Sequence, residues 1–147
     1  MLMLSLSLAL SLMLTQTPPV NVACGVLTSV QVTSLIGSAK TMPMGNAPNG
    51  SNCMFQNEDK VITVLVATNT TADAAQRLFD AKKRIAAGTD IAGWGVPAYG
   101  AAVKKVATSG VLKQLTFVEV KVSDSTQKLE AMAQVLQAAM KGFAARK

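Results

Sequence analysis

The sequence predicts a single α+β domain: an antiparallel sheet covered on one face by two long amphipathic helices and closed by one disulfide. The chain has 147 residues, half of them hydrophobic, which is enough for one domain with a substantial core. Two segments, 71–87 and 125–144, carry apolar residues at helical spacing. Apolar strand-like segments flank the first of them and are joined by short turns, which favours an antiparallel sheet over a parallel βαβ array.

The chain begins with an uncharged apolar run, MLMLSLSLALSLML, over residues 1–14. This length is typical of the hydrophobic region of a signal peptide and is shorter than the roughly 20 residues of a membrane-spanning helix. Neither a positively charged start nor a clear A-x-A cleavage site accompanies it, and Pro18-Pro19 disfavours a helix beyond it. We expect residues 1–23 to be signal peptide and spacer. Residues 24–147 are then an exported domain, periplasmic or secreted, without a transmembrane span.

Cys24 and Cys53 are the only two cysteines. Behind an export-like leader, such a pair indicates an oxidising compartment and one disulfide. A loop of about 30 residues closed in this way contributes roughly 3–4 kcal/mol in the chain-entropy description. Two alternatives are a pair of buried free thiols and a lipidated Cys24. A lipobox requires an aliphatic residue three positions before the cysteine, where this chain has Asn21.

Each of the three expected helices begins with a polar residue and a reciprocating one three positions later, the pattern of a capping box. The pairs are Thr28 with Gln31, Thr70 with Asp73, and Asp124 with Gln127. The helices are expected at 29–36, 71–87 and 125–144, and glycines at 37 and 88 end the first two. Leu136 lies in the middle of the apolar stripe of the last helix and is predicted to face the sheet.

The strands are expected at 53–57, 61–67, 101–107 and 111–122, with a short additional one near 40–44. Residues 61–67 are apolar at successive positions, which predicts a central strand. Glu58-Asp59 is expected to form the first hairpin turn, and Thr108-Ser109-Gly110 the second.

Two groups of residues carry a resemblance to a known family. The first group is Cys24, Leu27, Thr28, Val32, Gly37, Cys53 and Phe55, and the second is the turn Gly93-Trp94-Gly95-Val96-Pro97-Ala98-Tyr99. Over residues 24–145 the chain resembles small exported bacterial proteins and lipoproteins of unknown function, although Gln31 stands where that family usually has an acid. The resemblance implies a disulfide-closed α+β domain and supplies no active site. The expected order of elements is also similar to that of PsbP-like domains.

No catalytic constellation is evident. The chain has no histidine, which excludes Ser-His-Asp triads, Cys-His dyads and most zinc sites. Ser125 to Lys128 matches S-x-x-K without its partner motifs. Residues 93–98 match G-x-G-x-x-A but follow a predicted helix, whereas a dinucleotide site requires a preceding strand. We therefore expect a non-enzymatic protein with no catalytic, cofactor-binding or metal-binding residues. The alternatives are a structural accessory subunit of an envelope complex and an enzyme with an unrecognised site.

The net charge of +6 favours anionic partners such as envelope components, although a solvated basic surface is the alternative. The sole tryptophan and the sole tyrosine, Trp94 and Tyr99, are close in sequence to Lys104 and Lys105. Aromatic rings beside cations can bind an anionic ligand or another protein, so these four residues are the candidate binding surface. The alternative is that Trp94 fills one edge of the core. The basic cluster at 82–84 lacks interleaved aromatic residues, which argues against nucleic acid as a partner.

Overall fold

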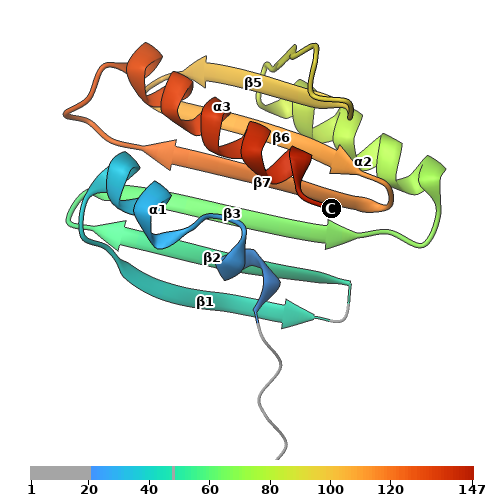
Figure 1. The fold of residues 1–147 in the computed structure, drawn as a ribbon, viewed down its shortest axis with the longest axis horizontal. Coiled ribbons are helices and arrows are strands. Elements are labelled where there is room, and N and C mark those ends of the chain that lie inside the picture. The colour runs from blue at the N-terminus through green and yellow to red at the C-terminus, as the bar shows by residue number, and fades with distance from the viewer. Residues whose placement is uncertain (1–20, 48) are drawn as a thin grey trace, which may run out of the picture.

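The fold is a seven-stranded antiparallel sheet with helices on both faces, seen in the computed structural model, which describes residues 21–47 and 49–147 (Figure 1). In chain order the elements are a short 3₁₀ helix η1 (Val22–Gly25), α1 (Ser29–Ile36), β1 (Lys40–Ala47), β2 (Gly50–Asn57), β3 (Lys60–Thr68), α2 (Ala72–Ile85), β4 (Thr89–Asp90), β5 (Ala98–Val103), β6 (Val106–Lys113), β7 (Thr116–Ser123) and α3 (Leu129–Ala145). The α+β class and the antiparallel sheet are confirmed. The expected signal run at 1–14 lies outside the described residues.

The strands follow one another across the sheet in the order β1-β2-β3-β7-β6-β5-β4. β3 is an interior strand, as its apolar sequence predicts, with Val64 opposite Cys53 of β2 and Val120 of β7. Alternate residues of β3, namely Ile62, Val64 and Val66, are buried, and their neighbours on the other face are half-buried. The hairpin turn at Glu58-Asp59 is also confirmed, and Glu58 has the positive φ of +55° that such a turn requires.

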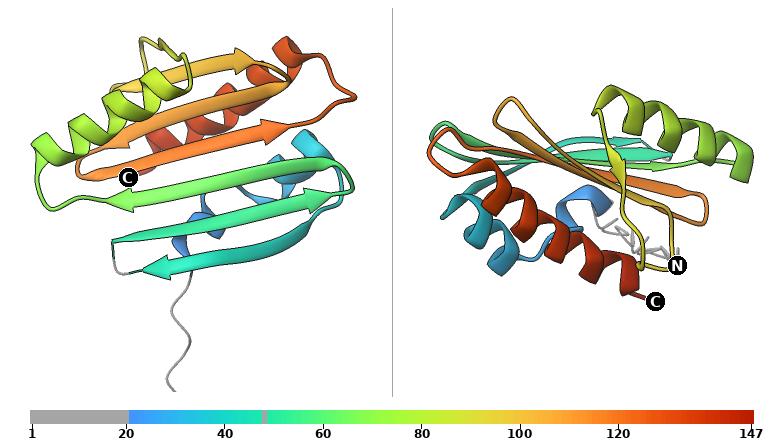
Figure 2. Two further views of the ribbon diagram at one scale, coloured as in Figure 1. Left: turned by 180° about the vertical axis from the view of Figure 1, so that it is seen from behind. Right: turned by 90° about the horizontal axis from the view of Figure 1, so that it is seen from above.

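The two longer helices lie on opposite faces of the sheet, so the expectation that they share one face is wrong (Figure 2). α1 and α3 cover the face that holds the larger core cluster, and α2 covers a second, aromatic cluster on the other face. The reason lies in β5, β6 and β7, because Tyr99, Leu112 and Phe117 are apolar on one face while Ala98, Val111 and Val118 are apolar on the other. A sheet region that is apolar on both faces requires a cover on each.

The first two helices begin at or within one residue of their predicted starts. α1 begins after Thr28 with the predicted capping box, in which Gln31 returns the hydrogen bond. Gly37 ends it at a φ of +80°. The N-cap of α2 is Thr71, one residue later than expected, and its hydroxyl accepts from the amide of Ala74.

The predicted start of α3 is wrong by several residues, because the helix begins at Leu129. The carboxylate of Asp124 instead accepts two hydrogen bonds from Thr126, one from its amide and one from its hydroxyl. The side-chain amide of Gln127 donates to the carbonyl oxygen of Leu35. Leu136 of α3 is fully buried, as predicted.

The two strands predicted at 101–107 and 111–122 are also wrong, because the structure has three strands, β5, β6 and β7, in this region. The expected turn at 108–110 lies inside β6, and the expected long strand 111–122 is divided by a hairpin turn at Gln114-Leu115. The other turn falls at Lys104-Lys105, where φ is +49° and +66°. Gly110 lies within β6 and must be glycine there, because a Cβ atom would lie 2.2 Å from Cε1 of Tyr99. This glycine therefore makes room for a ring and does not form a turn.

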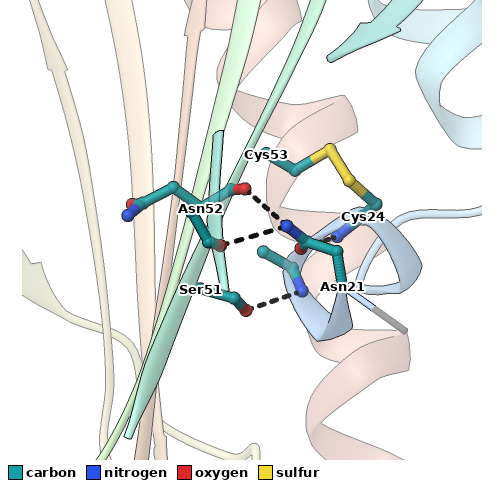
Figure 3. Close-up of a disulfide and its surroundings, with 7 residues drawn as sticks. Asn21, Cys24, Ser51, Asn52 and Cys53 are labelled. Carbon is teal, nitrogen blue, oxygen red and sulfur yellow. Dashed lines mark hydrogen bonds between the residues drawn. A yellow bond between two sulfur atoms is a disulfide. The ribbon is translucent and has the colours of Figure 1, made fainter. Parts of the chain in front are cut away.

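The predicted disulfide between Cys24 and Cys53 is present and joins η1 to β2, with 5.1 Å between the Cα atoms (Figure 3). The side-chain amide of Asn21 donates to the carbonyl oxygen of Asn52 at 3.0 Å, and the amide of Ala23 donates to the Ser51 hydroxyl at 3.1 Å (Figure 3). Since Ala23 is fully buried, the ordered domain includes residues that precede Cys24. The expected boundary after residue 23 therefore falls inside η1.

In the described ranges, no helix combines the length and apolar character needed to cross a bilayer.

Candidate functional site

Tyr99 lies in β5 and is completely buried beneath α2. Its ring centroid is 5.3 Å from that of Phe79 in α2 and 6.5 Å from that of Phe117 in β7. Its hydroxyl donates a hydrogen bond to the carboxylate of Glu119. The prediction that Tyr99 contributes to a binding surface is therefore wrong, because the ring completes the aromatic cluster under α2.

Glu119 is the acidic member of this buried pair, with 4% of its surface exposed. The amine of Lys121 lies 3.5 Å from its second carboxylate oxygen. Burial raises the pKa of Tyr99, and the hydrogen bond to Glu119 and its negative charge raise that pKa further. The phenol thus remains a hydrogen-bond donor at every physiological pH. These groups stabilise the α2 side of the sheet and are not accessible to a ligand.

Trp94 is half-buried and packs against the core cluster of the opposite face. The loop between β4 and β5 that carries it passes around the edge of the sheet from the α2 side toward the α3 side (Figure 2). Lys104 and Lys105 are exposed, but they lie at the far end of β5 from Trp94. Six strand residues span roughly 20 Å, so the four predicted residues do not form one surface.

A hollow of about 460 Å³ lies at the C-terminal end of α3, against the β6–β7 turn. Its lining comes from the loop before β5, from β6, β7 and their turn, and from α3 and the residues after it: Val96, Lys113, Gln114, Thr116, Phe143, Arg146 and Lys147. The volume falls within the range of about 300–1,000 Å³ that is usual for small-molecule sites. We call this the basic hollow.

Phe143 is the aromatic residue of the basic hollow, and two cations lie over its ring. The amine of Lys113 is 5.3 Å from the ring centroid, and the guanidinium carbon of Arg146 is 5.6 Å from it. The Lys113 amine also donates to the carbonyl oxygens of Phe143 and Arg146, where the end of α3 concentrates negative partial charge. Lys113 thus fixes the end of α3 against β6.

The side chains that line the basic hollow carry positive charges and no negative one. None of the ion pairs in the described part of the chain includes Lys113, Arg146 or Lys147, and no acidic residue lines the hollow. Like charges gathered beside an apolar wall favour the entry of an anion, which relieves their mutual repulsion. Chemically, the arrangement suits binding of a negative group. Residues 21–47 and 49–147 contain no cluster of three potential metal ligands.

The sequence predicted an aromatic ring beside cations, and the structure has this combination at other residues. Phe143 and Arg146 are close in sequence, but Lys113 is 33 residues away from Arg146. Only the packing of α3 on β6 brings the Lys113 amine to the ring. Val96, two residues after Trp94, is the link between the predicted loop and the basic hollow.

The fold and this site define a class of protein: a disulfide-closed α+β domain with a basic hollow on the α3 side of an antiparallel sheet. No protein-family model and no curated protein sequence matches the chain.

Proposed function

We propose that this chain is an exported, non-enzymatic protein of the bacterial envelope, periplasmic or extracellular, that works by binding an anionic partner. The disulfide is the observation that carries the proposal, because such bonds persist in oxidising compartments and are rare in the reducing cytosol. The basic hollow supports the binding role, since its lining side chains include three cations and an aromatic ring but no acidic group.

The position of the disulfide supports a structural need for oxidation. Cys53 is 1% exposed and lies in β2, while Cys24 belongs to η1, which packs on β2 and β3. After reduction, only its hydrogen bonds and the burial of Ala23 would hold η1 on the sheet. A protein built in this way functions best where the bond remains oxidised.

The resemblance to small exported bacterial proteins and lipoproteins supports the same proposal through the residues that carry it, Cys24, Thr28, Gly37 and Cys53. Three strands precede α2 in the chain and four follow it, and this order supports the further proposal of a PsbP-like arrangement. Neither resemblance contributes a ligand.

Export is tested by expressing the full chain in a bacterium with an oxidising periplasm and alkylating thiols before cell disruption. We expect the protein outside the cytoplasm with no alkylatable thiol. A chain that starts at residue 21 and lacks the leader serves as the control and should remain in the cytoplasm. Full-length protein recovered from the cytoplasm with two reactive thiols would contradict the proposal.

A structural accessory subunit is the second candidate, favoured by the half of the sheet that α2 leaves uncovered (Figure 2). The strand pairings put Met42, Met54 and Val61 on this face of β1, β2 and β3, where all three are half-buried. If this face contacts a partner, the native protein should sediment as a complex larger than a monomer. Met54→Lys should then release the monomer without lowering the thermal midpoint, whereas Gln134→Lys on exposed α3 surface should not. Sedimentation as a monomer in envelope extracts would exclude this candidate.

A further inference from the structure

We infer that the basic hollow binds an anionic amphiphile: one oxyanionic head group, carboxylate or phosphate, attached to an apolar chain. The inference rests on the binding role given to this hollow under the proposed function. It names the ligand class and does not depend on where the protein is exported.

The cations account for the head group. Arg146 and Lys147 adjoin one another at the end of α3, and Lys113 approaches from β6. Lys113 is partly engaged by the carbonyl oxygens at the end of α3, which leaves Arg146 and Lys147 as the main partners for an added charge. An arginine guanidinium can donate two parallel hydrogen bonds to a carboxylate or phosphate, and such charge-assisted bonds are stronger than neutral ones.

The remaining lining accounts for the apolar chain. The Phe143 ring and Val96 are both half-buried and are the apolar residues of the lining. The charged groups of Lys113 and Arg146 lie 5.3 and 5.6 Å from the centroid of this ring. A bare inorganic anion would engage the charges and leave the apolar wall in water. A ligand with an apolar chain covers both.

Binding is measured by calorimetry on the purified, oxidised full chain with four probes: decanoate, 1-decanol, acetate and inorganic phosphate, with decanoate kept below its micellar concentration. We expect decanoate to bind at least about tenfold more tightly than each of the other three. Its affinity should fall as salt rises, because part of the attraction is electrostatic. Amide NMR shifts should concentrate at residue 96, at 113–116 and at 143–147.

Two double variants with the same loss of charge separate a local site from a general effect of net charge. Arg146→Gln/Lys147→Gln should weaken decanoate binding about tenfold and leave 1-decanol binding unchanged. Lys104→Gln/Lys105→Gln alters an exposed turn at the far end of β5 and should change decanoate affinity less than about twofold. Val96→Thr keeps the side-chain shape, makes the wall more polar, and should weaken decanoate about threefold. Unchanged thermal midpoints would show that each variant is folded.

Several results would overturn the inference. Equal affinity for decanoate and 1-decanol would show that the charged head group contributes nothing to binding. Equal affinity for decanoate and phosphate would show that the hollow binds small anions and does not use the apolar chain. The latter result would leave the proposed function intact. If the two double variants weakened decanoate binding equally, the attraction would come from the net charge of the protein and not from a local site. Failure of decanoate to bind, or NMR shifts at residues outside the hollow, would also contradict the inference. The results of the export and alkylation experiment would not be affected.

Discussion

The buried hydrogen bond between Tyr99 and Glu119 joins β5 to β7 beneath α2. A carboxylate removed from water is costly unless donors surround it. Here the phenol hydroxyl donates to one oxygen of Glu119, and Lys121 lies 3.5 Å from the other. The tyrosine thus contributes to stability both through its ring, which packs on Phe79 and Phe117, and through its hydroxyl.

Replacing Tyr99 by phenylalanine should separate these two contributions. The ring contacts remain, but Glu119 loses its buried donor, so we expect the free energy of unfolding to fall by about 1–3 kcal/mol. Urea denaturation of the wild type, Tyr99→Phe, Glu119→Gln and the double variant forms a mutant cycle. A coupling energy near zero would show that the hydroxyl contributes little and that the ring alone matters.

Asp124 links stability to pH at the start of the segment before α3. It is 1% exposed, and one of its oxygens lies 3.9 Å from the Lys60 amine. Burial by itself raises the pKa of Asp124, but the hydrogen bonds from Thr126 and the charge of Lys60 outweigh this effect, so the pKa lies below its ordinary value. A carboxyl group with a lowered pKa stabilises the fold above its unfolded pKa of about 3.9 and loses that contribution as the pH falls.

Asp124→Asn should therefore destabilise the protein by about 1–3 kcal/mol at neutral pH, through the weakened bonds to Thr126 and the lost charge near Lys60. The difference from wild type should shrink as the pH falls below about 4, because wild-type Asp124 is then also becoming neutral. Urea midpoints at several pH values test this. Asp59→Asn, on an exposed residue bonded to Ser125, is the matched control and should cost less than about 0.5 kcal/mol. A pH-independent difference would contradict the assignment.

At the scale of elements, Gly110 allows β6 to pass beneath the Tyr99 ring. A Cβ atom at this position would lie 2.2 Å from the ring, and Phe79 and Phe117 limit the space into which the ring can move. Gly110→Ala should therefore destabilise the fold by more than about 2 kcal/mol, as other overpacked core positions do. Gly142→Ala is the matched control, since no atom lies within 4 Å of an added Cβ in α3. There alanine should stabilise the helix by up to about 1 kcal/mol.

Thermal or urea unfolding of both glycine variants provides the measurement. Opposite signs are expected from the same chemical change because one site is crowded and the other is open. Equal, small effects would mean that the Tyr99 ring can shift away from β6, and the aromatic cluster beneath α2 would then be loosely packed.

The same elements show why part of the fold could be predicted from the sequence. The capping box of α1 was predictable because both of its hydrogen bonds join residues three positions apart. Asp124 with Gln127 has the same pattern, but Gln127 bonds to Leu35, 92 residues away, and the helix starts later. Gly110 was mistaken for a turn residue for a similar reason, because its partner is the ring of Tyr99 on a neighbouring strand.

The candidate site was only partly predictable on the same grounds. A cation beside an aromatic ring was expected around Trp94, where sequence proximity suggested it. The structure assembles that chemistry from β6 and α3, which are distant in sequence and adjacent in space. Alternation within a strand also determines which residues share a face, so Tyr99 faces α2 while Ala98 faces α3.

At the scale of the whole molecule, the disulfide joins the N-terminal segment to the half of the sheet that α2 does not cover. The bond closes a loop with a sequence separation of 29 residues. The chain-entropy description gives such a loop roughly 3–4 kcal/mol of stability. Cys24→Ser/Cys53→Ser should lower the free energy of unfolding by about that amount in urea. Reducing agent should have the same effect on the wild type and none on the double variant. Equal stability of oxidised and reduced wild type would contradict this prediction.

The N-terminal limit of the domain gives the last prediction, because residues before Cys24 also belong to it. The Asn21 amide donates to the carbonyl oxygens of Gly45 and Asn52, at 3.1 and 3.0 Å, and thereby links the start of η1 to the β1–β2 hairpin (Figure 3). Ala23 is fully buried, and its amide donates to Ser51. These contacts predict that a chain starting at Cys24 is less stable than one starting at Asn21.

The comparison uses two oxidised proteins, one starting at residue 21 and one at residue 24, each preceded only by an initiating methionine. Losing the buried hydrogen bond of Ala23, the two exposed ones of Asn21 and the burial of Ala23 itself should reduce the free energy of unfolding by about 1–3 kcal/mol. Asn21→Ala in the longer protein removes the side-chain bonds alone and should account for part of that difference. If both proteins unfold at the same urea concentration, the disulfide alone holds η1 on the sheet, and the residues before Cys24 contribute nothing to stability.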